Sequence, residues 1–146
     1  MDRIDERILR ELDINGRIAN VDLADKVGLS PSATLRRVQE LERSGIIKGY
    51  RAIIDKQKLS IGFIAYIAIG LADHSKKAQL AFEEHVQFCS EVTECHNITG
   101  GTEYLLRVET KDLAAYKRFH SNVLGDIPQV REITTMVVMD SPKDIR

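Results

Sequence analysis

The chain has 146 residues, of which 43% are hydrophobic and 29% charged, with a formal net charge of −1. This composition excludes a disordered chain, and the length suffices for one ordinary core or two small ones. The N-terminus lacks the basic-then-apolar order of a signal peptide, and the longest apolar run, Ile61 to Ala72, is too short to cross a bilayer. We therefore expect a cytoplasmic protein with no membrane partner.

Basic side chains concentrate in one part of the first third. Between Arg36 and Arg51 the chain carries five Lys or Arg residues against two acidic ones, whereas acidic residues gather between Asp2 and Asp13. A local basic stripe on a nearly neutral domain is typical of proteins that bind nucleic acid.

Apolar spacing and capping residues predict three short helices in this region. The first covers Asp2–Ile14, the second is capped by Asn20 and stopped by Gly28, and the third covers Pro31–Ser44 with Ser30 as its N-cap. Two short helices joined by a glycine-containing turn, with another helix packed across both, form the helix-turn-helix arrangement.

The third helix has the residue types of a recognition helix. At about 100° per residue, its apolar positions share an inner face, and small polar residues and arginines lie outward, with Arg37 at the border. The alternative is a solvated, arginine-bearing helix in an unrelated three-helix module. The inner positions are Leu35, Val38 and Leu41, and the outer ones are Ser32, Ala33, Arg36, Glu40 and Arg43.

The remainder of the chain predicts a domain with a different periodicity. Residues 48–55 are expected to form an extended strand and 56–62 a polar connector, so we divide the chain into a helix-turn-helix domain 1–50, a linker 51–62 and a second domain 63–146. The second domain is an expected βαββαβ ferredoxin-like fold, which makes the whole chain α+β. Its elements are strands Phe63–Leu71, Val92–Thr99, Glu103–Thr110 and Val130–Met139, a helix Ser75–Phe88, and a helix capped by Asp112 with Leu113, Tyr116, His120 and Val123 inward.

Both faces of the expected sheet are apolar. Along the first strand, Ile67 and the residues two positions from it lie on one side, and Tyr66 and the residues two positions from it lie on the other. Both sets are apolar, and the last strand repeats this pattern. Two helices can cover only one face, and a large exposed apolar face usually marks an interface. We therefore expect the chain to form homodimers through its sheets.

No catalytic, metal or cofactor site is predicted. His85, Cys89, Cys95 and His96 could suggest zinc, but adjacent residues of a strand point to opposite faces, so these four cannot converge well. We expect the cysteines to be reduced core residues. The other serines, histidines and aspartates form no nucleophile motif, and Gly100-Gly101 lacks the helix and lysine of a phosphate loop.

The whole chain resembles the Lrp/AsnC family, the feast/famine transcriptional regulators of bacteria and archaea. The resemblance depends on ordered motifs: Asp2-x-x-Asp5-x-x-Ile8-Leu9, Val27-Gly28-Leu29-Ser30, Leu35-Arg36-Arg37-Val38, Gly45-Ile46-Ile47 and Gly100-x-x-x-Tyr104-Leu105-Leu106-Arg107-Val108. It implies a winged-type helix-turn-helix domain that binds double-stranded DNA and homodimers that often assemble into tetramers or octamers. The expected DNA-binding residues are Ser30, Ser32, Ala33, Thr34, Arg36 and Arg37, with Arg36 at base edges and Arg37 mainly on phosphate.

The glycine pair between the second and third strands of the sheet is the candidate effector site. Two consecutive glycines leave backbone amides open to a carboxylate, and Glu103 could accept from an ammonium group. The simpler interpretation is a tight strand connection that needs only glycine flexibility. The resemblance favours an effector, because this loop matches the family's ligand-binding segment. The expected residues are Gly100, Gly101, Thr102, Glu103 and Tyr104, between subunits.

These observations predict a sequence-specific transcriptional regulator that responds to a small metabolite. The expected metabolite is an amino acid. Two alternatives remain open: an architectural DNA-binding protein without an effector, and a metabolite-processing enzyme of ferredoxin-like fold with accessory helices. The arginine-bearing third helix and the lack of a catalytic motif favour a regulator that is not an enzyme.

Overall fold

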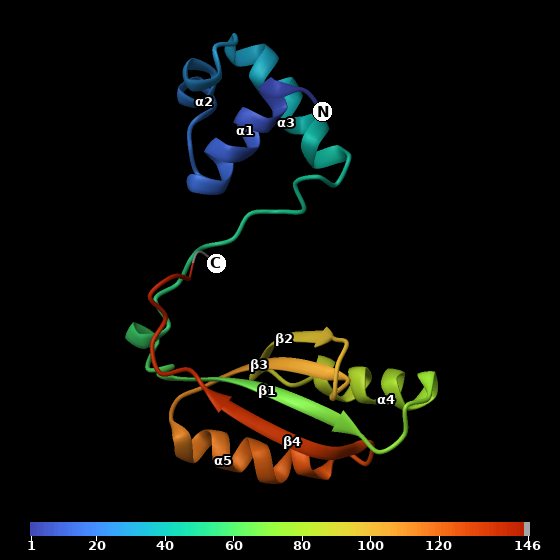
Figure 1. Ribbon diagram of the computed structural model, residues 1–146. Coiled ribbons are helices and arrows are strands. Elements are labelled where there is room, and N and C mark those ends of the chain that lie inside the picture. Colours follow the sequence, from blue (N-terminus) through green and yellow to red (C-terminus); the bar gives the residue numbers. More distant parts are fainter. Residues whose placement is uncertain (145–146) are drawn as a thin grey trace. The chain divides into compact units, whose positions relative to one another are not determined.

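The computed structural model describes residues 1–144 and divides into two compact units at Ile53 and Ile54 (Figure 1). The N-terminal unit contains α1 (Arg3–Ile14), α2 (Asn20–Val27) and α3 (Pro31–Arg43). Its core is formed by buried side chains from all three helices, namely Ile8, Leu23, Val27 and Leu41. The three helices occur where their apolar spacing predicts them.

One predicted cap is wrong. Asn20 is the first helical residue of α2 and Ala19 is the N-cap, without a side-chain hydrogen bond. The Asn20 amide instead donates to the carbonyl of Pro31, at 2.8 Å, and so links the start of α2 to the start of α3. A side chain with this longer-range partner is not available to cap its own helix.

The segment between the two units is not a strand in this chain. Residues 48–55 have no regular secondary structure, although the sequence predicts an extended strand there, and a short 3-10 turn follows at Gln57–Leu59. Strand pairing requires a neighbouring strand, and residues 1–144 place none beside this segment.

The C-terminal unit is an antiparallel four-stranded sheet with two helices. Its strands are β1 (Phe63–Leu71), β2 (Val92–Asn97), β3 (Tyr104–Thr110) and β4 (Val130–Val137), in the order β2-β3-β1-β4. The helices α4 (Lys76–Gln87) and α5 (Leu113–Asn122) connect them, followed by a 3-10 turn at Leu124–Asp126. This is the ferredoxin-like βαββαβ fold, which confirms the predicted fold class.

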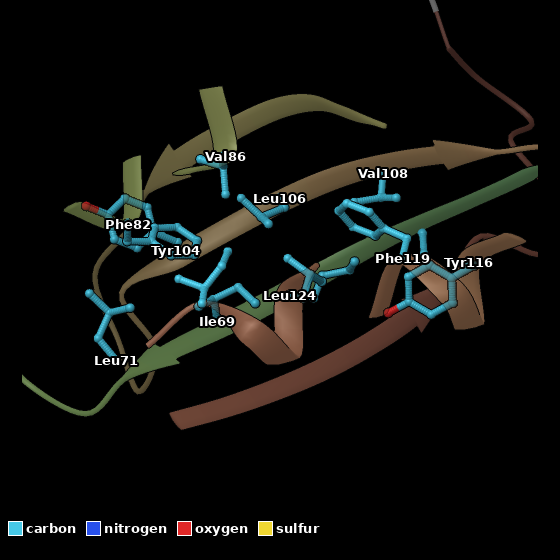
Figure 2. Close-up of a cluster of buried hydrophobic side chains, with 13 residues drawn as sticks. Ile69, Leu71, Phe82, Val86, Tyr104, Leu106, Val108, Tyr116, Phe119 and Leu124 are labelled. Carbon is cyan, nitrogen blue, oxygen red and sulfur yellow. The ribbon is translucent and has the colours of Figure 1, made fainter. Parts of the chain in front are cut away.

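The core of this unit lies between the helices and one face of the sheet. Figure 2 shows side chains of α4 and α5, including Phe82 and Phe119, gathered against β1 and β3. Asp112 caps α5, as the sequence predicts, and Ser75 is the N-cap of α4, whose first helical residue is Lys76. One inward assignment is wrong: Leu113 is exposed, and α5 buries Phe119 with Tyr116 instead. None of the described helices is long and apolar enough to span a membrane.

Candidate nucleic-acid interface and effector loop

Local hydrogen bonds fix the beginning of α3. Gly28 ends α2 with φ of 75°, a left-handed conformation that favours glycine. Two residues later, the Ser30 hydroxyl accepts from the backbone N–H of Ala33 at 3.2 Å, and Pro31 occupies the first turn, where its missing N–H costs nothing. The turn and the cap together set the direction in which α3 leaves α2.

The outward face of α3 differs from the predicted face at two positions. Thr34 is fully buried and its hydroxyl donates to the carbonyl of Ser30 at 3.0 Å. Its predicted contact with DNA stays a prediction. Leu35, expected inside, has 46% of its surface exposed. On α3, Thr34 and Leu41 are therefore buried, and Leu35 lies outside the core. Ser32 and Arg36 are exposed, as expected.

Two of the arginines on α3 are paired within the unit. One guanidinium nitrogen of Arg37 lies 2.8 Å from carboxylate oxygens of both Asp2 and Asp5 at the start of α1, and Arg43 forms two hydrogen bonds with Glu40. Arg36, by contrast, has no ion pair within residues 1–144. Arg36 is therefore the arginine of α3 whose charge is most available to a ligand.

The Arg37 contact also changes the titration of Asp2. The backbone N–H of Asp5 and then the Arg37 guanidinium hold the pKa of the Asp2 carboxyl below its usual value. Arg37 thus joins α1 to α3. The predicted phosphate contact of Arg37 stays a prediction, but its charge is already balanced by these two carboxylates.

The glycine pair in the second unit opens the connection between β2 and β3. Gly100 has φ of 116°, a conformation that strains other residues, and neither Gly100 nor Gly101 has an atom within 4 Å of where a β-carbon would lie. The space that a side chain would take at either glycine is therefore empty.

Glu103 is held by contacts from the end of β1 and the residues after it. One carboxylate oxygen accepts from the backbone N–H of Leu71 at 2.7 Å, and the other lies 2.6 Å from Nδ1 of His74. The Leu71 N–H makes the largest contribution to lowering the pKa of Glu103, and His74 adds to it. The carboxylate is therefore held as an anion at the end of β1, and its contact with His74 is not predicted by the sequence.

Tyr104 supports the loop from inside the unit. Its ring is buried against Phe82, with ring centroids 4.7 Å apart, and its hydroxyl donates to Glu83 at 2.6 Å. Burial, followed by the hydrogen bond to Glu83, raises the pKa of the Tyr104 hydroxyl. The side chain belongs to the core, and the predicted contact of Tyr104 with an effector stays a prediction.

The cysteines and histidines considered for metal binding are dispersed. Cys89 donates to the backbone carbonyl of His85 at 3.4 Å, and His96 contacts Glu94 at 3.1 Å. Cys95 is exposed on the edge strand β2, so its predicted core position is wrong. Across the part of the chain that the structure describes, no three His, Cys, Asp or Glu side chains form a metal-binding group.

The sheet face opposite the helices is largely apolar. Ala65, Ile67 and Ile69 point into the core, so the alternate residues of β1 and their cross-strand partners face away from it. We call this surface the open face; it comprises Ile64, Tyr66, Ala68, Leu105, Arg107, Glu109, Glu132, Thr134 and Met136.

Charged side chains also lie on the open face, including Arg107, Glu109 and Glu132. Arg107 is buried, donates to the Tyr66 hydroxyl at 3.0 Å and pairs with Glu109 at 3.2 Å. Residues 138–144 pass beside it and line an open hollow of about 830 Å³ with Tyr66 and Arg107.

Family models match both units. Residues 1–48 match a winged helix-turn-helix DNA-binding domain, and residues 64–146 match the Lrp/AsnC ligand binding domain. A helix-turn-helix unit followed by a ligand-binding unit of this fold defines a DNA-binding transcriptional regulator.

Related proteins agree with this class. The leucine-responsive regulatory proteins of Klebsiella pneumoniae and Escherichia coli are each 38% identical to the chain over 143 residues, covering 98% of it and 87% of their own length. The chain belongs to the Lrp/AsnC family of transcriptional regulators. Its relatives are regulators, which confirms that it is not an enzyme.

Solved structures share the fold along almost the whole chain. A transcriptional regulator of Neisseria meningitidis in complex with L-methionine has a TM-score of 0.95 at 33% identity and covers 99% of this chain and 93% of its own. An AsnC family regulator from Agrobacterium tumefaciens has a TM-score of 0.93 at 35% identity, covering 99% and 94%.

Proposed function

We propose that the chain is an amino-acid-responsive regulator in which a small amino acid binds at Gly100, Gly101, Thr102 and Glu103 and changes DNA binding. The observation that carries this proposal is that one loop contains an open glycine backbone and, two residues after Gly101, a carboxylate held by Leu71 and His74. Backbone N–H groups suit the carboxylate of an amino acid, and Glu103 suits its ammonium group. The L-methionine complex of the Neisseria regulator supports the same ligand class.

The held Glu103 carboxylate still has capacity for a ligand. A carboxylate has roughly four lone-pair sites, and the Leu71 N–H and His74 use two of them. An ammonium group could therefore approach Glu103 without displacing either partner.

Calorimetry with amino acids tests the effector proposal. We expect wild-type protein to bind at least one of L-methionine, L-leucine and other small amino acids, and Gly101→Val to lose that binding, because the valine would occupy the open space beside Gly101. Gly101→Ala is the matched control and should lose less. Unchanged affinity in Gly101→Val would place the site elsewhere. No binding by wild type would favour an architectural protein without an effector.

We also propose that two chains pair through their open faces and present two α3 helices to one side of double-stranded DNA. An apolar sheet face is costly to leave in water, and covering it with a second copy removes that cost. Half-sites should then lie roughly 34 Å apart, or at a multiple of that spacing. Further assembly into tetramers or octamers belongs to the same proposal.

A further inference from the structure

The outward face of α3 contains a large apolar side chain, Leu35, which a role for α3 in binding phosphates would not explain. Leu35 is 46% exposed, and in α3 it is the large hydrophobic residue that lies outside the core. A single half-exposed leucine is common on protein surfaces, so its position among neighbouring side chains decides what it can do.

Helical geometry puts Leu35 among polar groups suited to base edges. At about 100° per residue, Ser32, Leu35, Arg36 and Gln39 fall within roughly 100° of arc, opposite the buried Thr34 and Leu41. All four are exposed. A protein-binding face would carry several apolar side chains together, whereas this face carries one leucine between a serine, an arginine and a glutamine.

The chemistry of these side chains points to specific base pairs. In the major groove a thymine presents a methyl group that apolar side chains contact, and an adenine presents N6–H and N7, which a glutamine amide pairs with in a bidentate manner. Ser32 to Gln39 spans roughly 10 Å along the helix, which corresponds to about three base pairs. The unpaired Arg36 lies on the same face and suits guanine.

We propose that Leu35 and Gln39 determine operator specificity, with Leu35 contacting a thymine methyl group and Gln39 pairing with an adenine in the same half-site. The proposal rests on the DNA-binding role of the N-terminal unit. It predicts that each half-site contains A·T pairs beside the base pair that Arg36 reads.

Atomic substitutions in DNA test the leucine contact. The preferred sequence is first selected from random DNA with wild-type protein, and each thymine is then replaced by deoxyuridine, which lacks only the methyl group. We expect a roughly three- to fivefold loss of affinity at one thymine of each half-site, the effect of burying one methyl. Leu35→Ala should bind the unmodified DNA more weakly and show no further loss with deoxyuridine at that position.

The glutamine contact has its own probe. Replacing the adenine by 7-deazaadenine removes N7, so wild type should lose affinity at one adenine while Gln39→Ala is insensitive to the change. Leu80→Ala, which alters a comparably exposed leucine on α4, should respond to both modified bases like wild type. Thermal melting of each variant checks that folding is retained.

Three results would overturn parts of this account. Wild-type binding that is specific yet insensitive to deoxyuridine at every position would exclude a methyl contact. Retained sensitivity in Leu35→Ala or Gln39→Ala would assign the contact to another residue. If wild type selects no preferred sequence at all, sequence-specific reading by α3 fails together with this proposal.

Discussion

Glu103 is the residue whose charge most directly tests the effector proposal. In Glu103→Gln the amide oxygen can still accept from the Leu71 N–H, so the variant removes the charge while retaining the hydrogen bond. We expect amino-acid affinity to decrease by roughly tenfold or more, since a charge-assisted hydrogen bond contributes about 1.5–3 kcal/mol. Calorimetry measures it, with the exposed Glu84→Gln on α4 as control. Equal losses in both variants would contradict a direct role for Glu103.

Among the residues of α3, Arg36 is expected to contribute most to base recognition through its charged guanidinium group. Arg36→Ala should weaken binding of the preferred DNA by about 1–3 kcal/mol and relax the preference at one base position. Arg43→Ala, which removes a guanidinium already paired with Glu40, should change affinity less. Fluorescence anisotropy with the selected DNA and single-base variants measures both. Equal losses for the two arginines would indicate general electrostatic attraction in place of base reading.

At the scale of the elements, apolar spacing predicts where helices and strands occur better than which residues they bury. The bounds of β1 agree fully with the expected Phe63–Leu71, because a short apolar run rich in isoleucine and aromatic residues favours a strand. On α3, the sequence predicts Leu35 inside and, through the family resemblance, Thr34 at the DNA, whereas the structure buries Thr34 and exposes Leu35. Thr34 is buried with its hydroxyl bonded to its own helix, which removes the cost of burying that group.

For the effector loop too, the sequence predicts where the loop lies but not which residues contact each other. Glycine spacing locates the connection between β2 and β3, but the partner of Glu103 comes from residues about thirty positions earlier in the chain. Such a contact depends on the antiparallel register of β1 and β3, which pairs Ile69 with Tyr104 and which the sequence does not specify.

The contact between α1 and α3 predicts a pH dependence. The pKa of Asp2 is lowered in the folded state, so its interaction with Arg37 stabilises the N-terminal unit above the ordinary aspartate pKa and is lost as the pH falls through the lowered value. Thermal melting of Arg37→Ala should therefore give a lower Tm than wild type at neutral pH and a smaller difference in strong acid. A difference that grows as the pH falls would contradict this role.

Two phenylalanines near α4 test the core of the C-terminal unit. Phe82 is fully buried, whereas Phe88, just after the helix, is 82% exposed. Phe82→Ala should reduce the free energy of unfolding by about 3–5 kcal/mol, and Phe88→Ala by less than about 0.5 kcal/mol. Urea denaturation distinguishes them. A large effect of Phe88→Ala would reveal a contact made by another subunit.

At the scale of the whole molecule, the open face is expected to pair two chains. Met136 lies on this face opposite Tyr66, and a glutamate there would place charge in the proposed interface. Met136→Glu should therefore be monomeric by light scattering at micromolar concentration, while Leu80→Glu, at a comparably exposed leucine on α4, should not. A wild-type monomer would contradict the pairing of sheets.

The central claim is that one molecule couples amino-acid binding to DNA binding. Because the two binding equilibria are thermodynamically linked, the coupling can be measured as a change in DNA affinity. A ligand changes DNA affinity only if it binds the DNA-competent and incompetent states with different affinities. The measurement is the dissociation constant of wild-type protein for its selected DNA, with and without a saturating amino acid that calorimetry shows to bind. We predict a change of at least about fivefold, in either direction, that is absent in Gly101→Val. The same dissociation constant with and without the bound amino acid would contradict the claim.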